Sequence, residues 1–337
     1  MVGIDIGSRT IKIVEVQKEG ASYSLVASGV VSYSGSPVEK MTDEKEFATI
    51  GAIIKKLHAE AGVSEKNVTL SIPEPQVFTR TIRFPLLTDA EIASAVKWEA
   101  EQYIPIPVAE AIIQHTVLAR DEKSSPPEVL VLLVAAPRTV IEKYTKIISL
   151  AGLVPVAVET ELMAVTRALA PVDKTVIVLD FGANSTNIAI AKNGLLSFSR
   201  SIPIAGEAFT RAVSQGLGVT AMQAEEYKKT YGLSQSQLEG KVKTALDPVL
   251  RLVVDEIKKA INYYQTEEKG EVPGMVMVSG GTSGMPDIIA RLTSLIGMEV
   301  VIASPFAKLA MDPETAKKLA PYGPLYSVAV GLALREE

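Results

Sequence analysis

The sequence predicts an α/β fold made of two like-built lobes, with a smaller αβ subdomain inserted into the first lobe. The main observation is an internal repeat: a strand with an acid, then one residue and a glycine, occurs at Asp5 and Gly7 and again at Asp180 and Gly182. A repeat separated by about half of the chain implies two lobes built alike. Between the repeats, strand and helix signals also alternate in residues 76–154, but their pattern differs from that of the residues before them. This difference predicts the insertion.

The composition excludes several classes of function. The net charge is −5 and the basic residues are scattered, so nothing favours binding to nucleic acid. The sequence has no cysteine, which excludes disulfides and thiolate metal sites, and His58 and His115 are too far apart in sequence to suggest a zinc site. No stretch approaches the ~20 apolar residues of a membrane span, and no signal segment opens the chain, so we expect a cytoplasmic protein.

The first element, residues 3–12, is predicted to be a hairpin. An apolar strand carries Asp5 and breaks at Gly7, and Ser8 and Thr10 lie in the bend that follows. Glycine lets the backbone approach a ligand closely, and adjacent N–H groups in such a bend form an anion-binding concavity. An acid just before the bend suits a metal ion that bridges acid and phosphate. Alone, the motif also fits an ordinary hairpin turn.

The rest of the first lobe is predicted as strand, helix and strand. Alternation indicates a strand at residues 23–31, and a further strand at residues 68–72 ends at two prolines. Residues 43–62 show helical spacing, with an apolar side made of Phe47, Ile50, Ile53, Ile54 and Leu57. This order is that of half an α/β lobe.

The insertion contains its own strands and helices. The first helix begins with a capping box formed by Thr88 and Glu91. It carries the single tryptophan, Trp98, for which core or half-buried packing is expected and an anchor for a partner is the alternative. The predicted strands are 77–84, 112–118 and 129–136, and the predicted helices are 87–103 and 138–151.

A strand at residues 154–158 leads into a helix that ends at residue 169 and connects the lobes. Glu159 and Glu161 lie at the first turn of this helix. Acids at that position usually serve the helix dipole. The sharper hypothesis is that one of these two carboxylates orients an attacking water beside a terminal phosphate.

The second lobe begins with the repeated hairpin, residues 173–194. Helices are then predicted at 208–215, 220–230 and 249–265. Glu225 and Lys228 share a face of the middle helix. They form either an ordinary surface ion pair, which stabilises little, or a contact with the ribose hydroxyls of a nucleotide.

A third glycine bend follows near the end of the chain. Residues 274–287 read as a strand, a bend with Gly280, Gly281 and Gly284, and a helix start. Such glycines let backbone lie flat against a planar ring, and a helix N-terminus behind them favours an anion. Residues 326–334 form a small-residue helix, predicted to be the second connection between the lobes.

Together these bends resemble the actin-like ATPase superfamily, whose lobes are a ribonuclease-H-like repeat and which includes actin, DnaK-type chaperones and sugar kinases. The insertion falls where FtsA carries its distinctive subdomain, and residues 87–105 look like the corresponding stretch of the PilM family of type IV pilus assembly proteins. The five superfamily segments match in order: phosphate loop one (5–12), first connection (159–169), phosphate loop two (180–187), adenosine loop (279–284) and second connection (327–334).

The resemblance implies ATP and magnesium in the cleft between the lobes. Asp5 and Asp180 would hold the magnesium ion. Glu225 and Lys228 would meet the ribose. The other implied contacts are with phosphates, at Gly7, Ser8, Thr10, Lys12, Gly182, Asn184 and Ser185, and with adenine, at Gly280, Gly281 and Gly284. The implied divisions are first lobe 1–75, inserted subdomain 76–154, connecting helix 155–171, second lobe 172–323 and returning helix 324–337.

The resemblance also implies partners. PilM-like proteins bind the cytoplasmic N-terminal tail of the membrane protein PilN in a groove beside the inserted subdomain, and so join other pilus assembly proteins at the inner membrane. FtsA ends in a membrane-binding helix, whereas this sequence ends at residues 334–337 without one, so we expect recruitment through a protein partner. The function expected is an ATP-binding scaffold with slow or absent turnover. The alternatives are a sugar-type kinase and an FtsA-like filament protein that self-associates.

Overall fold

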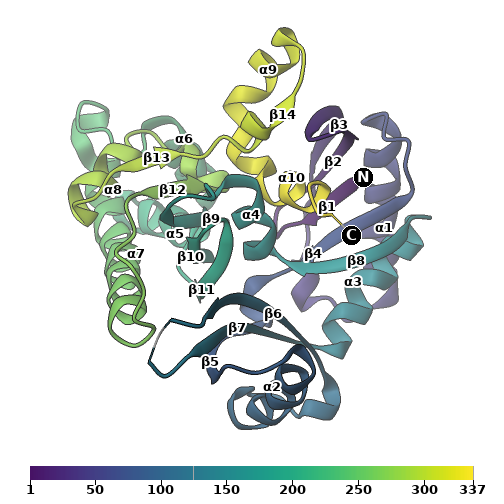
Figure 1. Cartoon of the computed structure of the whole chain (residues 1–337). Helices are drawn as coiled ribbons and strands as arrows, with labels where there is room; N and C mark the ends of the chain where they lie inside the picture. The colour runs from purple at the N-terminus through teal and green to yellow at the C-terminus, as the bar shows by residue number, and fades with distance from the viewer. Residues whose placement is uncertain (124, 337) are drawn as a thin grey trace.

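The computed structural model of this chain describes residues 1–123 and 125–336. The described residues form sheets of six, five and three strands. Figure 1 shows the six-stranded sheet in the lobe on the right, the five-stranded sheet in the lobe on the left, and the three-stranded sheet below them. Both ends of the chain lie in the first lobe, so the chain passes from the first lobe to the second and back again.

The first lobe is built on the sheet β14-β3-β2-β1-β4-β8. Its centre is the hairpin of β1 and β2, followed by β4 and β8 in parallel, as expected for half of an α/β lobe. Helices α1 and α3 pack together on one face, where Ile54, Leu70 and Ile147 are fully buried. The elements are β1 (Val2–Ile6), β2 (Thr10–Glu19), β3 (Ser22–Ser32), α1 (Glu44–Glu60), β4 (Asn67–Ile72), α3 (Arg138–Leu150), β8 (Val154–Thr160), β14 (Leu309–Ala310) and α9 (Pro313–Leu319).

The second lobe repeats the plan of the first. Its sheet has the order β11-β10-β9-β12-β13, which matches β3-β2-β1-β4-β8 strand for strand. Asp180 on β9 faces Asn187 on β10, in the position where Asp5 faces Lys12. The elements are β9 (Thr175–Phe181), β10 (Thr186–Lys192), β11 (Leu195–Ile202), α5 (Gly206–Leu217), α6 (Ala221–Tyr231), α7 (Lys241–Thr266), β12 (Val276–Ser279), α8 (Ile288–Ile296) and β13 (Val300–Ile302).

Two short helices, α4 (Glu161–Leu169) and α10 (Ser327–Ala333), lie between the lobes. A side chain at Gly331 would bring its Cβ to 1.8 Å from the carbonyl oxygen of Ala164, and one at Gly3 would reach 2.2 Å from that of Ala329. No carbon atom fits at such distances, so only glycine lets α10 lie directly on α4 and β1. The small-residue helix therefore packs closely on another element, as its composition predicted, and its role as the second inter-lobe connection stays a prediction.

The inserted subdomain is a three-stranded sheet covered by one helix. β5 (Phe78–Pro85), β7 (Glu128–Pro137) and β6 (Ala111–Asp121) lie in that order, and α2 (Asp89–Tyr103) packs on them. Its small core is separate from that of the lobes and contains Ile92, Val96 and Leu133. Helix α3, which we placed in the insertion, buries its apolar side against the first lobe. The exact domain boundaries stay predictions.

Two expectations about elements were wrong. Trp98 is not core: it is 63% exposed on α2, because the buried stripe of that helix is Ile92, Val96 and Ala100. Helix α7 starts at Lys241 instead of 249, and it continues through Pro248, which usually ends a helix. Within the described part of the chain, no helix combines the length and apolar character required to cross a bilayer.

Candidate functional site

A cleft of about 580 Å³ lies between the two lobes. Glycine bends from both lobes form its walls, and α4 and α6 contribute side chains. Every residue that the sequence analysis assigned to a nucleotide, a metal ion or a reacting water lines it, with the single exception of Glu159. The predicted residues that line it, among others, are Asp5, Gly7, Ser8, Thr10, Lys12, Glu161, Asp180, Gly182, Asn184, Ser185, Glu225, Lys228, Gly280, Gly281 and Gly284.

Phosphate loop one is a tight bend over a buried ion pair. The backbone N–H of Gly7 donates to the carbonyl of Thr10 at 3.1 Å, which closes the bend. Below it, the Nζ of Lys12 donates to the Oδ2 of Asp5 at 2.9 Å, and both side chains are buried. Tyr33 fixes the outer side, because its hydroxyl donates to the Gly7 carbonyl at 2.8 Å. The bend is therefore held from both sides, and its residues Gly7, Ser8 and Thr10 line the cleft.

Phosphate loop two closes in the same way. The N–H of Gly182 donates to the carbonyl of Ser185 at 3.1 Å, three residues on, as in loop one. A Cβ at position 182 would lie 2.9 Å from that same carbonyl oxygen, so the bend requires glycine. Two bends of one design thus face a common cleft, each with an aspartate at its base.

The acids at the floor of the cleft carry an excess of negative charge. The pKa of Asp180 is raised to about 6, chiefly by burial and then by the charge of Asp5, against the opposing effects of Lys12 and a hydrogen bond from Asn187. Burial also raises the pKa of Glu161, with contributions from Asp180 and Asp5. A bound cation would relieve this repulsion. Carboxylate oxygens suit Mg²⁺, which keeps several waters and binds one or two protein carboxylates together with phosphates.

The protein alone does not offer a complete metal cage. Among residues 1–123 and 125–336, no group of three or more acids, histidines or cysteines is arranged to hold a metal ion. A magnesium ion at Asp5 and Asp180 would therefore take its other ligands from water and phosphate. This donor set fits the ion that the resemblance implied.

The two acids of the first connection have different surroundings. The Oε2 of Glu161 accepts from the side chain of Asn187 at 3.1 Å, and Glu161 faces the cleft. Glu159 does not line the cleft, because Arg167 and Arg335 hold its carboxylate beside α10, at 2.8 and 2.7 Å. Glu159 thus has no access to a reacting water, and of the two acids only Glu161 lies where one could bind.

Sequence reasoning missed a third acid in this region, Glu74. It lies between two prolines in the segment that joins β4 to the insertion. Its side chain is 3% exposed, its N–H donates to Glu161 Oε2 at 3.2 Å, and one of its oxygens accepts from the N–H of Leu162 at 3.4 Å. Burial raises the pKa of Glu74 to about 7. The only sequence signal was an isolated acid between prolines, which is also common in exposed turns.

The ion pair on α6 is not an ordinary surface pair. Lys228 is buried, and its Nζ donates to Glu225 at 2.6 Å, to Thr210 at 2.9 Å and to the carbonyl of Gly206 at 3.0 Å. Burial alone would raise the pKa of Glu225, but hydrogen bonds from Lys228 and Thr210 lower it to about 2. The pair is therefore a fixed, charged rim of the cleft.

The third glycine bend differs from its prediction in one respect. Gly280 has a φ of +83°, and a Cβ there would lie 2.5 Å from the carbonyl oxygen of Phe181, so this position requires glycine. A short 3₁₀ turn, Gly281–Gly284, follows, and α8 begins only at Ile288. No α-helix N-terminus lies directly behind these glycines, so an anion-binding role for α8 has no support.

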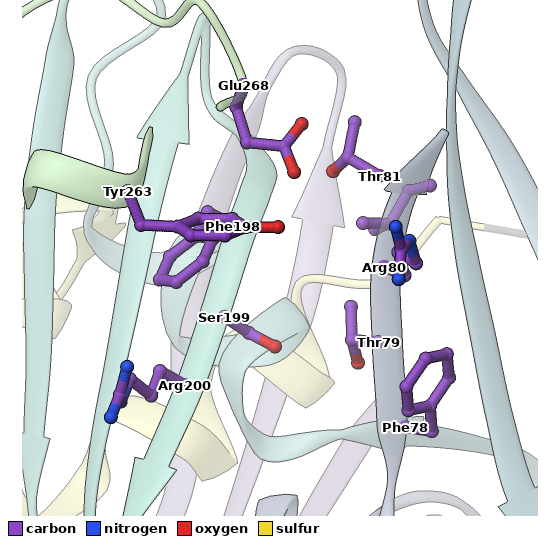
Figure 2. Close-up of a pocket in the computed structure, with 10 residues that line it drawn as sticks. Phe78, Thr79, Arg80, Thr81, Phe198, Ser199, Arg200, Tyr263 and Glu268 are labelled. Atoms are coloured by element: carbon purple, nitrogen blue, oxygen red, sulfur yellow. The ribbon is translucent and has the colours of Figure 1, made fainter. Parts of the chain in front are cut away.

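A smaller cavity of about 280 Å³ lies between the inserted subdomain and the second lobe. Figure 2 shows Thr79 and Thr81 on β5 and Ser199 on β11 in the space between the two strands, with Tyr263 beside Phe198 and the side chain of Arg200 turned away from β5. Both strands are at the edges of their sheets. None of the site residues that the sequence predicted lines this cavity.

A family match and a solved structure both indicate the PilM family. The family described as type IV pilus assembly protein PilM matches residues 3–337. A solved PilM–PilN type IV pilus biogenesis complex is 27% identical, with a TM-score of 0.84, and the match covers 99% of this chain and 97% of that one.

More distant relatives share the fold. Cell division protein FtsA of Bacillus subtilis (strain 168) is 24% identical over 256 residues, which are 64% of this chain and only 57% of that relative's length. FtsA of Staphylococcus epidermidis (strain ATCC 35984) is 23% identical over 353 residues, covering 93% of this chain and 76% of the relative. MreB5 of Spiroplasma citri bound to ADP has a TM-score of 0.53 at 13% identity, covering 98% and 94% of the two chains, which shows the fold alone. The chain has the α/β fold of actin-like ATPases and belongs to the PilM family of type IV pilus assembly proteins.

Proposed function

We propose that this chain is a scaffold that binds ATP with magnesium in its inter-lobe cleft and binds the cytoplasmic tail of a PilN-like membrane protein. One observation carries the nucleotide part. Two bends of the same design, each closed by a 3.1 Å hydrogen bond from a glycine and each based on an aspartate, face one cleft. Two such sets of N–H groups suit a polyphosphate held from both sides.

The cleft residues divide by chemistry into three groups. Backbone N–H groups and hydroxyls of the two loops, with Lys12, suit the phosphates, and Asp5 and Asp180 suit a hydrated magnesium ion. The rim pair Glu225 and Lys228 suits the ribose hydroxyls, and the glycine bend at residues 280–284 suits adenine. A magnesium ion bound there would neutralise charge on the phosphates.

Turnover is expected to be slow. Glu161 is the acid that could orient a water, but burial and the charges of Asp180, Asp5 and Glu74 raise its pKa, which favours the protonated form as long as no cation is bound. A protonated carboxyl accepts no proton from water. The chemistry of the cleft thus supports holding a nucleotide more than consuming it.

Family membership and the solved PilM–PilN complex support the partner. That complex is 27% identical to this chain over nearly its whole length. We propose that a PilN-like tail binds beside the inserted subdomain and keeps the protein peripheral to the inner membrane. The largest exposed aromatic side chain there, Trp98, is a candidate anchor.

Titration calorimetry with Mg-ATP tests the cleft. We expect saturable binding by the natural protein, and a loss of at least ~10-fold in affinity for Asp180→Asn or on adding EDTA, because a carboxylate or the cation is removed. Asp255→Asn, which changes an exposed acid on α7, is the matched control and should bind as before. If the natural protein gives no binding, the cleft assignment is wrong. Sugar-stimulated ATP consumption would instead favour the kinase alternative, and ATP-dependent light scattering the filament alternative.

A further inference from the structure

Arg9 and Glu207 are charged residues of the cleft to which the proposed function gives no role. Arg9 lies in phosphate loop one of the first lobe, and Glu207 lies in the first turn of α5 in the second lobe. The Nε and an Nη of Arg9 donate to the Oε1 of Glu207 at 3.2 and 2.8 Å. The pair therefore spans the mouth of the cleft between the lobes.

The carboxylate of Glu207 also meets phosphate loop two. With the amide of Asn184 oriented to suit its neighbours, its nitrogen lies 3.0 Å from Glu207 Oε1, and its oxygen accepts from the hydroxyl of Ser8 at 3.2 Å. Both Asn184 and Ser8 are residues to which the proposed function assigns phosphate contacts. An anionic side chain is thus bound by groups of the kind that bind a phosphate.

The backbone holds Glu207 in this position. The N–H of Gly206 donates to the carbonyl of Gly182 at 3.1 Å, and the N–H of Glu207 donates to that of Ala183 at 2.9 Å. A Cβ at position 206 would lie 2.9 Å from the hydroxyl of Thr282 and 3.2 Å from the carbonyl oxygen of Gly182, so glycine at this position lets α5 approach both glycine bends closely. The backbone of Glu207 is therefore held beside loop two, within reach of its polar groups.

The contact between the charges is weak enough to exchange. The side chains of Arg9 and Glu207 are 65% and 39% exposed, and ion pairs this exposed to water stabilise a fold little. A guanidinium binds a phosphate with two parallel hydrogen bonds, which is a stronger interaction. Arg9 therefore interacts more strongly with a phosphate than with the carboxylate of Glu207.

We propose that Arg9 is a further phosphate-binding residue and that Glu207 is an internal anion, which occupies the phosphate donors until a nucleotide displaces it. This inference rests on the proposed nucleotide site. It predicts that the two variants change the affinity for nucleotide in opposite directions. Removal of the charge of Glu207 strengthens nucleotide binding, whereas removal of the charge of Arg9 weakens it. A pair that only held the lobes together would give both variants the same sign.

The test is calorimetry of Glu207→Gln with Mg-ATP and, separately, with adenosine. We expect ATP to bind about three- to five-fold more tightly, since an exposed competing ion pair is lost, and adenosine to bind as before. The control is Glu271→Gln, which removes an acid paired with Lys192 at 2.8 Å outside the cleft and changes the net charge equally. It should leave both affinities unchanged.

Arg9→Gln completes the experiment. It should weaken ATP binding at least about three-fold. Adding Glu207→Gln to Arg9→Gln should increase the affinity for ATP less than Glu207→Gln does alone, because the two side chains act on each other. Any of four results would overturn the inference. Glu271→Gln could increase the affinity for ATP as much as Glu207→Gln does, or Glu207→Gln could increase the affinity for adenosine. Glu207→Gln could also leave the affinity for ATP unchanged, or both cleft variants could change that affinity in the same direction. Absence of ATP binding by the natural protein would instead refute the proposed site itself.

Discussion

At the scale of single residues, the two aspartates of the cleft are equivalent in position and different in charge balance. Asp5 faces Lys12 across its hairpin, whereas Asp180 faces the neutral Asn187. Burial and the charge of Asp5 therefore leave Asp180 with a raised pKa, about 6. The lobe repeat thus places two acids at the floor of the cleft, of which Asp5 is paired with a lysine and Asp180 is not. A bound cation would therefore stabilise the charged form of Asp180 more than that of Asp5.

Glu74 gives a pH dependence whose sign follows from its burial. Its pKa of about 7 lies above the ordinary value of 4.5, so the folded protein holds a proton there that the unfolded chain releases earlier. The resulting stability is present in full below pH 4.5 and is lost as the pH rises through 7. Glu74→Gln keeps the neutral form, so between pH 5 and 8 its melting temperature should fall less than that of the natural protein.

Thermal unfolding without nucleotide measures this difference. The natural protein should lose up to about 3 kcal/mol more than Glu74→Gln over that interval, as an order of magnitude for a buried acid. Glu271→Gln is the control, because hydrogen bonding to Lys192 lowers the pKa of that exposed acid out of the interval. Parallel pH profiles for the natural protein and Glu74→Gln would contradict the prediction.

The sequence predicted most of the site because its residues carry local signals. Aspartate, one residue and glycine can be recognised within a single hairpin, and its recurrence indicated the pairing of the lobes. Glu74, Arg9 and Glu207 carry no such signal, because their roles depend on contacts between segments far apart in the chain. Glu159 was misplaced for the same reason: Arg335, which holds it, is 176 residues away.

At the scale of elements, the contact between α4 and α10 determines how closely the lobes approach. We expect Gly331→Ala to lower stability by about 1–3 kcal/mol or more, because the added methyl group overlaps the carbonyl of Ala164. Gly274→Ala is the control, since a Cβ there would lie 3.9 Å from its nearest neighbour, the carbonyl of Thr175. Circular dichroism melts check both variants, and equal melting temperatures would show that α10 has room to move.

Elements with clear periodicity were predicted and short ones were not. β2, α1, α2 and α3 carry alternation or helical spacing over seven or more residues, and they form near the expected bounds. β13 and β14 are three and two residues long, which is too short to show any period. The small residues of α10 predicted a close contact, but only the fold identifies α4 and β1 as its partners.

At the scale of the whole molecule, the inserted subdomain is the part that the repeat does not explain. The two lobes share one strand order, and the insertion interrupts the first of them after β4. Its core is separate, and α2 presents Trp98 to solvent. A large exposed aromatic on a small appended subdomain is typical of a binding surface, since such side chains often carry much of an interface's energy.

Trp98→Ala separates that function from folding. Because the side chain is 63% exposed, its loss should change stability by no more than ~0.5 kcal/mol. If a PilN-like tail binds there, the affinity of a labelled tail peptide, measured by fluorescence anisotropy, should fall at least ~10-fold, as expected for an aromatic anchor. Tyr322→Ala removes an aromatic that is 55% exposed outside the insertion and should bind the peptide as the natural protein does. Unchanged affinity for Trp98→Ala would exclude α2 as the anchor and direct the search to other surfaces of the insertion, whereas equal losses in both variants would indicate nonspecific hydrophobic binding.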